Sequence, residues 1–273
     1  MNEPEPETAG WQLETSAAAA YETDFVPVIF EPWANRLIDR AGLRSGERVL
    51  DVACGTGIVA RCAAPHVGAD GSVVGLDVNE GMLSVAAETA DGSTPEIEWR
   101  EGDATDLPFD EDVFDVALCQ QGLQFVDEPV TALEEMQRVL APGGRTFVSV
   151  WRPITSNPAY VVLAEVLARH VGPEAGAMMH SPFPDWDLSE LRTFAEEAGF
   201  TAQTIVIDVA ASRFPSIEEF VRIELAGSPL ASEFTDESSR SALVRDVADE
   251  LDGYVDDEGL VSPMESHVLT ATE

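Results

Sequence analysis

Apolar and polar positions alternate regularly along the first half of the chain. Short apolar runs have the length and composition of buried strands at 48–52, 72–78, 95–100, 114–119 and 145–151. Segments with helical spacing lie between them, at 57–64, 80–90 and 129–140. Strands that alternate with helices predict βαβ units, and right-handed crossovers then place helices on both faces of a mostly parallel sheet.

The rest of the pattern extends this architecture at both ends. A helical, partly apolar stretch ends at Gly42, before the first strand, and predicts an N-terminal helical cap over residues 1–45. The α/β domain then covers 46–273, with a further helix at 187–200 and further strands at 202–211 and 264–273. Helical insertions occupy 158–184 and 216–262. They follow predicted strands at the edge where open sheets bind ligands, so they either form a lid or cover one end of the sheet.

The charge balance is extreme, with 51 acidic residues against 15 basic ones and a formal net charge of -36. All the basic residues are arginine. An acidic surface can dock a basic partner, or it can keep a protein hydrated in concentrated salt. Because the acids are spread along the whole chain, we favour the second, halophilic interpretation. The charge also argues against nucleic acid as a partner, since phosphates would be repelled.

Nothing in the sequence indicates export, a membrane span or a metal site. The chain begins MNEPEPETAG, without a basic and apolar leader, and no run reaches the roughly 18 apolar residues of a membrane helix. The 3 cysteines have no spacing typical of metal ligands. We therefore expect a cytoplasmic protein with buried, unpaired cysteines and no metal.

The turn in VLDVACGTG, residues 49–57, is the strongest sign of a ligand. Gly55 and Gly57 allow close approach of the backbone, and the helix that follows offers unpaired N–H groups. Asp77 ends the next strand, at a spacing that suits ribose hydroxyls. These features fit an NAD-dependent oxidoreductase equally well, but Asp51 before the glycines and Asp103 after the third strand argue for a different nucleotide cofactor.

These motifs together resemble the class I S-adenosylmethionine-dependent methyltransferases, and within them the branch of ubiquinone and menaquinone C-methyltransferases. The matching stretches, in family order, are VLDVACGTG, VVGLDVNEGML, EGDATDLPFDEDVFDV and RVLAPGG. The resemblance implies a doubly wound, Rossmann-like sheet of seven strands whose last strand is antiparallel.

The resemblance also implies roles for individual residues. The methionine end of S-adenosylmethionine is expected beside the first turn and the fourth strand, at Asp51, Ala53, Gly55, Thr56, Gly57 and Gln120. Asp77 is expected to bind the ribose hydroxyls. The adenine is expected between Val78 and Met82, with its amine near Asp103 and Ala104.

The acceptor site is less defined. Gln124 and Phe125 stand where many relatives have histidine. Candidate acceptor contacts are Tyr21, Phe25, Gln121, Gln124 and His180. A sulfonium methyl is already activated, so a general base is needed only where the acceptor must lose a proton, and no catalytic residue is assigned. Methyl transfer to a small molecule is the favoured function, and the alternative is a non-catalytic cofactor-binding protein that acts through a partner.

Overall fold

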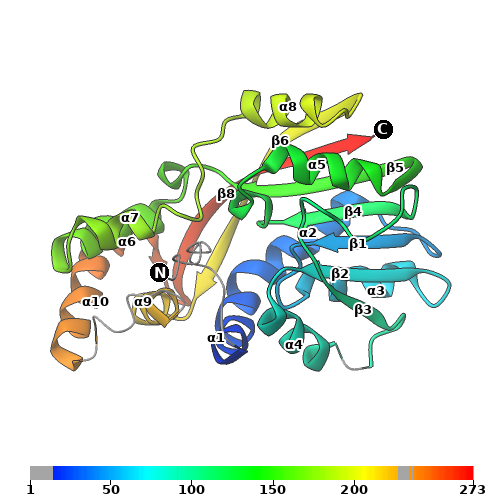
Figure 1. The fold of residues 1–273 in the computed structure, drawn as a ribbon. Helices are drawn as coiled ribbons and strands as arrows, with labels where there is room; N and C mark the ends of the chain where they lie inside the picture. Colours follow the sequence, from blue (N-terminus) through cyan, green and yellow to red (C-terminus); the bar gives the residue numbers. More distant parts are fainter. Residues whose placement is uncertain (1–14, 91, 227–233, 235, 273) are drawn as a thin grey trace, which may run out of the picture.

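The computed structural model describes residues 15–90, 92–226, 234 and 236–272. Its sheet has the strand order β3-β2-β1-β4-β5-β8-β6 (Figure 1). The strands are β1 (Arg48–Val52), β2 (Ser72–Asp77), β3 (Ile97–Glu101), β4 (Phe114–Gln120), β5 (Leu140–Trp151), β6 (Ala202–Phe214) and β8 (Gly259–Thr272). The β1 to β5 strands are parallel, and β8 runs antiparallel to both β5 and β6.

The predicted fold class is confirmed, with a correction to the number of strands. Within the described residues the sheet has eight strands, because β7 (Val255–Asp256) forms a two-residue pairing with the start of β8. This short strand lies at a hairpin that ends at Gly259, and two residues are too few for a periodic pattern to reveal them.

Helices cover both faces of the sheet, because successive side chains of a strand point to opposite faces and both sets are apolar. Val49 packs with α2 (Glu31–Ala41) and α3 (Ile58–Val67), whereas its neighbour Leu50 packs with α5 (Pro129–Arg138) and α8 (Leu188–Glu197) on the opposite face. The α4 helix (Glu80–Thr89) lies beside β2 and β3, and α1 (Thr15–Ala20) packs against it.

Several boundaries differ from the sequence prediction. The α3 helix continues past Ala64 through Pro65 and ends at Gly68, which has a φ of 64°. A proline late in a helix removes one donor without stopping it when packing holds the turn. The β6 and β8 strands extend beyond the predicted 202–211 and 264–273 because they pair with each other from Ala202 and Thr272 to Phe214 and Leu260.

The long β6–β8 ladder connects the sheet to the insertions. Its outer part, beyond the pairing of β8 with β5, reaches a group of helices at the left of Figure 1. These helices are α6 (Pro158–His170), α7 (Pro173–Met178), α9 (Ile217–Ala226) and α10 (Glu237–Leu251). They share one apolar cluster with Phe214 and Leu260 of the ladder. The cap continues from α1 through a π-helical segment, η1 (Tyr21–Phe30), into α2.

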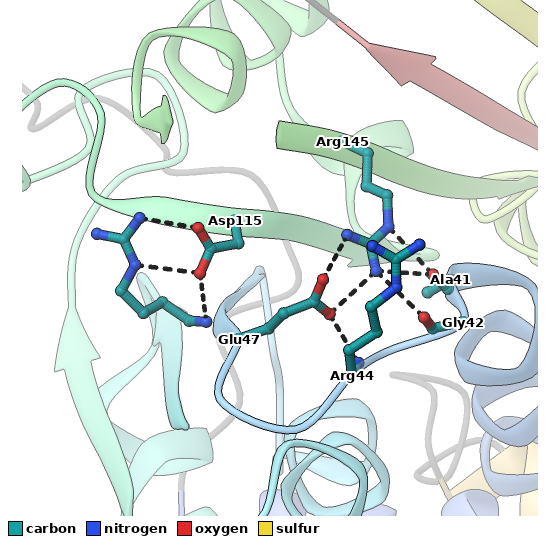
Figure 2. A network of polar contacts seen from close by, with 7 residues as sticks. Ala41, Gly42, Arg44, Glu47, Asp115 and Arg145 are labelled. Carbon is teal, nitrogen blue, oxygen red and sulfur yellow. Dashed lines mark hydrogen bonds and ion pairs between the residues drawn. The ribbon is translucent and has the colours of Figure 1, made fainter. Parts of the chain in front are cut away.

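Ion pairs tie the amino ends of the parallel strands together (Figure 2). Arg145 pairs with Glu47 at 2.8 Å and donates to the carbonyls of Ala41 and Gly42 at the end of α2. Arg48 binds Asp115 at 2.8 Å and holds the pKa of that carboxyl below its usual range. These structural contacts therefore occupy the amino ends of the strands and leave the carboxyl ends at the opposite edge of the sheet.

No helix in the described ranges is long and apolar enough to cross a bilayer. Cys54, Cys62 and Cys119 are free thiols, and the described residues contain no cluster of side chains that would hold a metal.

Candidate functional site

A cavity of about 1100 Å³ lies at the carboxyl ends of the parallel strands. It is bounded by the sheet, by the N-terminal cap and by residues of the insertions. Most of the residues predicted from the sequence line it, namely Tyr21, Phe25, Asp51, Ala53, Gly55, Asp77, Val78, Met82, Asp103, Ala104, Gln120 and Gln121. Its volume is slightly above the roughly 300–1,000 Å³ of typical small-molecule pockets, which is compatible with a nucleotide and a second small molecule.

The turn after β1 brings its backbone to the cavity through unusual dihedral angles. Ala53 has a φ of 54° and Gly55 a φ of 55°, and both line the cavity. Such a conformation at alanine is strained, and strain of this kind concentrates at ligand sites. Thr56 and Gly57 belong to the same turn but do not line the cavity.

Asp51 projects from the end of β1 and is only partly satisfied. Its Oδ2 accepts a hydrogen bond from the Ala60 N–H at 3.0 Å, in the first turn of α3. Its Oδ1 is buried, and no described residue donates to it. Burial raises the pKa of Asp51 to about 8, and the negative charge of Asp77 adds to this rise. A cationic ligand group in the cavity would satisfy Oδ1 and stabilise the charged carboxylate.

Asp77 ends β2 in a fixed orientation. Its Oδ2 accepts from the Gly55 N–H at 2.8 Å and its Oδ1 from the Asn79 N–H at 2.9 Å. Burial raises its pKa despite these bonds. Each carboxylate oxygen has a further lone pair, so the group can still receive two ligand hydroxyls. Val78 beside it is 56% exposed, although it is apolar, and this exposed surface faces the cavity.

The third and fourth strands complete the sheet side of the cavity. Asp103, just beyond β3, is exposed, and its Oδ1 accepts from the Thr105 N–H and hydroxyl. Gln120 ends β4, where its side-chain N–H donates to the Phe30 carbonyl at 3.0 Å. The buried Oε1 of Gln120 receives no hydrogen bond from any residue that the structure describes. Gln121 follows with a φ of 53° and donates to Ser266.

The cap contributes aromatic rings to the lining of the cavity. Tyr21 packs against Phe25 and Phe30, with ring centroids 5.7 and 5.1 Å apart. Burial raises the pKa of Tyr21, and the nearby charge of Asp77 raises it further. The predicted cap residues Tyr21 and Phe25 therefore reach the same cavity as the strand ends.

Two predicted acceptor contacts lie elsewhere. Gln124 donates to the Pro182 carbonyl at 2.7 Å and accepts from the Trp151 N–H at 3.3 Å, so it connects β5 to the loop after α7 and does not line the cavity. His180 is exposed in the same loop, outside the cavity lining.

A further part of the cavity, its far half, was not predicted from the sequence. It is built from Trp151, Tyr160, Met179, Phe183, Glu224 and Met264. One feature of the sequence indicated this part of the cavity: Glu224 places a carboxyl on the apolar face of a helix, one turn after Phe220.

Comparisons with known proteins agree with this geometry. Residues 49–144 match the family model described as a methyltransferase domain. The chain is 35% identical to the chloroplastic 2-phytyl-1,4-beta-naphthoquinone methyltransferase of Arabidopsis thaliana, over 62% of this chain and 70% of that protein. It is 33% identical to a demethylmenaquinone methyltransferase of Staphylococcus aureus, over 62% of this chain and 73% of that protein.

Other matches are shorter or more distant. The similarity to the 2-phytyl-1,4-naphtoquinone methyltransferase of Synechococcus elongatus is 41% identity over 42% of this chain, and it spans about half (51%) of that relative. The YcgJ protein of Bacillus subtilis has a TM-score of 0.59 at 18% identity, with 87% of this chain and 96% of that chain covered. This structural likeness concerns the fold alone. The cavity at the strand ends and the extended similarity to two quinone methyltransferases show that the chain belongs to the class I S-adenosylmethionine-dependent methyltransferases, in the quinone C-methyltransferase-like branch.

Proposed function

We propose that the protein transfers a methyl group from S-adenosylmethionine to a small-molecule acceptor bound in the same cavity. One observation carries the proposal: the buried carboxyls of Asp51 and Asp77 lie at the carboxyl ends of adjacent parallel strands and line one cavity. They lie on either side of a turn whose backbone enters the left-handed region.

The residues present fit this cofactor. The unpartnered Asp51 Oδ1 and Gln120 Oε1 among the described residues are acceptors suited to the ammonium of the methionine part. Asp77 would bind the ribose hydroxyls, Val78 and Met82 would contact the adenine, and Asp103 would meet its amine. Further expected cofactor contacts are Ala53, Gly55, Ala104 and, through the fold of the turn, Thr56 and Gly57.

When bound, the cofactor supplies a methyl group that is already activated by its sulfonium. The protein's own residues then have to bind, orient and exclude water. Water would be excluded by two sets of aromatic rings. These are Tyr21 and Phe25 of the cap, and Trp151 and Phe183 in the wall of the cavity.

We also propose that the acceptor is an apolar, ring-shaped molecule related to a quinone. Two relatives are named as quinone methyltransferases, and the far half of the cavity has the aromatic and thioether lining that such a ring would need. The cap and the insertions would together form the lid, since Tyr21 of the cap and Glu224 of the insertion line one cavity.

Calorimetric titration tests the cofactor proposal. Wild-type protein is expected to bind S-adenosylhomocysteine and not NAD, and the reverse preference would contradict the proposal. Asp77→Ala is expected to weaken S-adenosylhomocysteine binding by about 1–3 kcal/mol because ligand hydroxyls lose their acceptor. Asp115→Asn, at the opposite end of the sheet, is the matched control and should keep the wild-type affinity.

Transfer of an isotope-labelled methyl group to a demethylquinol then tests the activity. Cofactor binding without transfer to any apolar acceptor would favour a non-catalytic binding protein instead.

A further inference from the structure

The far half of the cavity contains a buried carboxyl that cofactor binding does not require. Glu224 in α9 is 7% exposed, and Tyr160 in α6 is 6% exposed. The Tyr160 hydroxyl donates to Glu224 Oε1 at 2.8 Å, and both residues line the cavity. The two are 64 positions apart in the chain, so the folding of the insertions brings them together.

The surroundings of this pair are apolar. The Tyr160 ring packs against Phe183 and Phe220, with centroids 4.9 and 5.7 Å apart. Within the described part of the chain, Glu224 forms no salt bridge, and its neighbour Arg222 pairs instead with Asp24 and Glu219. Burying a charged carboxyl in this setting without a cation is unfavourable, and an apolar side chain would avoid this cost.

A buried ionisable group in a ligand cavity marks a candidate functional position. Burial raises the pKa of Glu224 to about 7, which reflects the desolvated position already evident from the contacts. Above this pKa, Tyr160 donates its only proton to the carboxylate, so the ionised pair presents acceptors to the cavity and no free donor. Such a pair selects a ligand that brings a donor of its own.

We propose that the Glu224–Tyr160 pair recognises the methyl acceptor by accepting a hydrogen bond from a hydroxyl group on an otherwise apolar ring. A neutral hydroxyl matches walls made of aromatic and methionine side chains, because only one polar group then has to be desolvated. This inference rests on the proposed function and deepens it, since it names the residues that would distinguish a hydroxylated ring from its oxidised or masked form.

The test compares ring probes that differ in their donors. Fluorescence titrations of the full chain, saturated with S-adenosylhomocysteine under anaerobic conditions, use 1,4-dihydroxynaphthalene and 1,4-dimethoxynaphthalene. Wild-type protein is expected to bind the dihydroxy probe about tenfold more tightly, as one hydrogen bond to a charged group implies. Glu224→Met should reduce this preference to about twofold or less, and Tyr160→Phe should reduce it in part.

Glu218→Gln is the matched control, because Glu218 is an exposed carboxyl on the same helix. It should keep the wild-type preference. Calorimetric binding of S-adenosylhomocysteine reports folding and the cofactor site separately, and it should be unchanged in every variant.

Failure of wild-type protein to bind S-adenosylhomocysteine would refute the proposed function. Normal binding of it, together with an unchanged preference in Glu224→Met, would overturn only the role of the pair. Tighter binding of the cationic probe 1-naphthylmethylamine than of the dihydroxy probe would overturn recognition of a hydroxyl and would favour an amine acceptor.

Discussion

Trp99 of β3 explains, at the scale of single residues, why the turn after β1 needs its second glycine. A Cβ at Gly57 would lie 2.2 Å from the Trp99 ring, and a Cβ at Gly75 would lie 2.4 Å from the same ring. The ring therefore lies across two glycines and has little freedom to move away from either. Gly57 acts on the ligand turn through this packing and through its φ of 84°, and it does not line the cavity.

Gly57→Ala is expected to destabilise the protein by about 2–4 kcal/mol, because overpacking against Trp99 adds to the strain of a left-handed alanine. Gly143→Ala is the matched control, since Gly143 has a φ of 80° and a Cβ added there would meet nothing within 4 Å. It should lose only about 1 kcal/mol. Urea unfolding measures the free energy of unfolding of both variants. An equal decrease in the two would show that the Trp99 ring moves aside.

Glu224 makes stability depend on pH in a defined window. Its pKa rises from the ordinary 4.5 to about 7 in the folded protein because of burial. With the folded pKa above the unfolded one, the contribution of this group to stability is complete below pH 4.5 and is lost as the pH rises through about 7.

Glu224→Gln cannot ionise, so its stability relative to wild type should rise by about 3 kcal/mol across this window. Unfolding free energies measured below and above the window give this difference directly. A constant difference between Glu224→Gln and wild type would mean that the Glu224 carboxyl is solvated in the folded protein.

At the scale of elements, an ion pair joins the cap to the insertion above the cavity. Arg222 of α9 binds Asp24 of η1 at 3.1 Å, and Asp24 lines the cavity. Arg222 is 44% exposed at its side chain, so this pair adds little to stability. We expect it to affect ligand release instead, because it links the two segments that we propose form the lid.

Arg222→Ala is therefore expected to speed the dissociation of S-adenosylhomocysteine severalfold while the free energy of unfolding changes by less than about 1 kcal/mol. Stopped-flow displacement measures the rate. Arg245→Ala on α10, at a side chain that is 68% exposed, should leave the rate unchanged. An unaltered rate in Arg222→Ala would mean that release does not require these segments to part.

The elements also show how much of the fold and of the candidate site the sequence predicts. The strand β1 matched its predicted residues because a buried strand is a local apolar run that ends at a ligand turn. The acceptor half could not be predicted, since Tyr160 and Glu224 meet only when α6 and α9 pack together. The contacts of Gln124 also depend on tertiary structure, because its hydrogen bonds go to Pro182 and Trp151, which are distant in sequence.

At the scale of the whole molecule, the net charge of -36 dominates. Arginines offset part of it in ion pairs such as those of Arg36, Arg169 and Arg213. Other acids, among them Asp249, Asp252 and Asp257, are exposed. Like charges that surround a folded chain repel one another, and salt shortens the range of this repulsion from about 10 Å at 0.1 M to about 3 Å at 1 M.

We therefore expect the unfolding midpoint to rise strongly from about 0.05 M to about 3 M KCl. Salt also strengthens apolar burial to some degree, so the charge effect needs its own comparison. The triple variant Asp249→Asn, Asp252→Asn and Asp257→Asn removes exposed charges without altering the core. It should melt higher than wild type at low salt and respond less steeply to KCl, because less repulsion remains to be screened. Identical salt responses in the two proteins would mean that the acidic surface does not govern stability, and its purpose would then be sought in a basic partner.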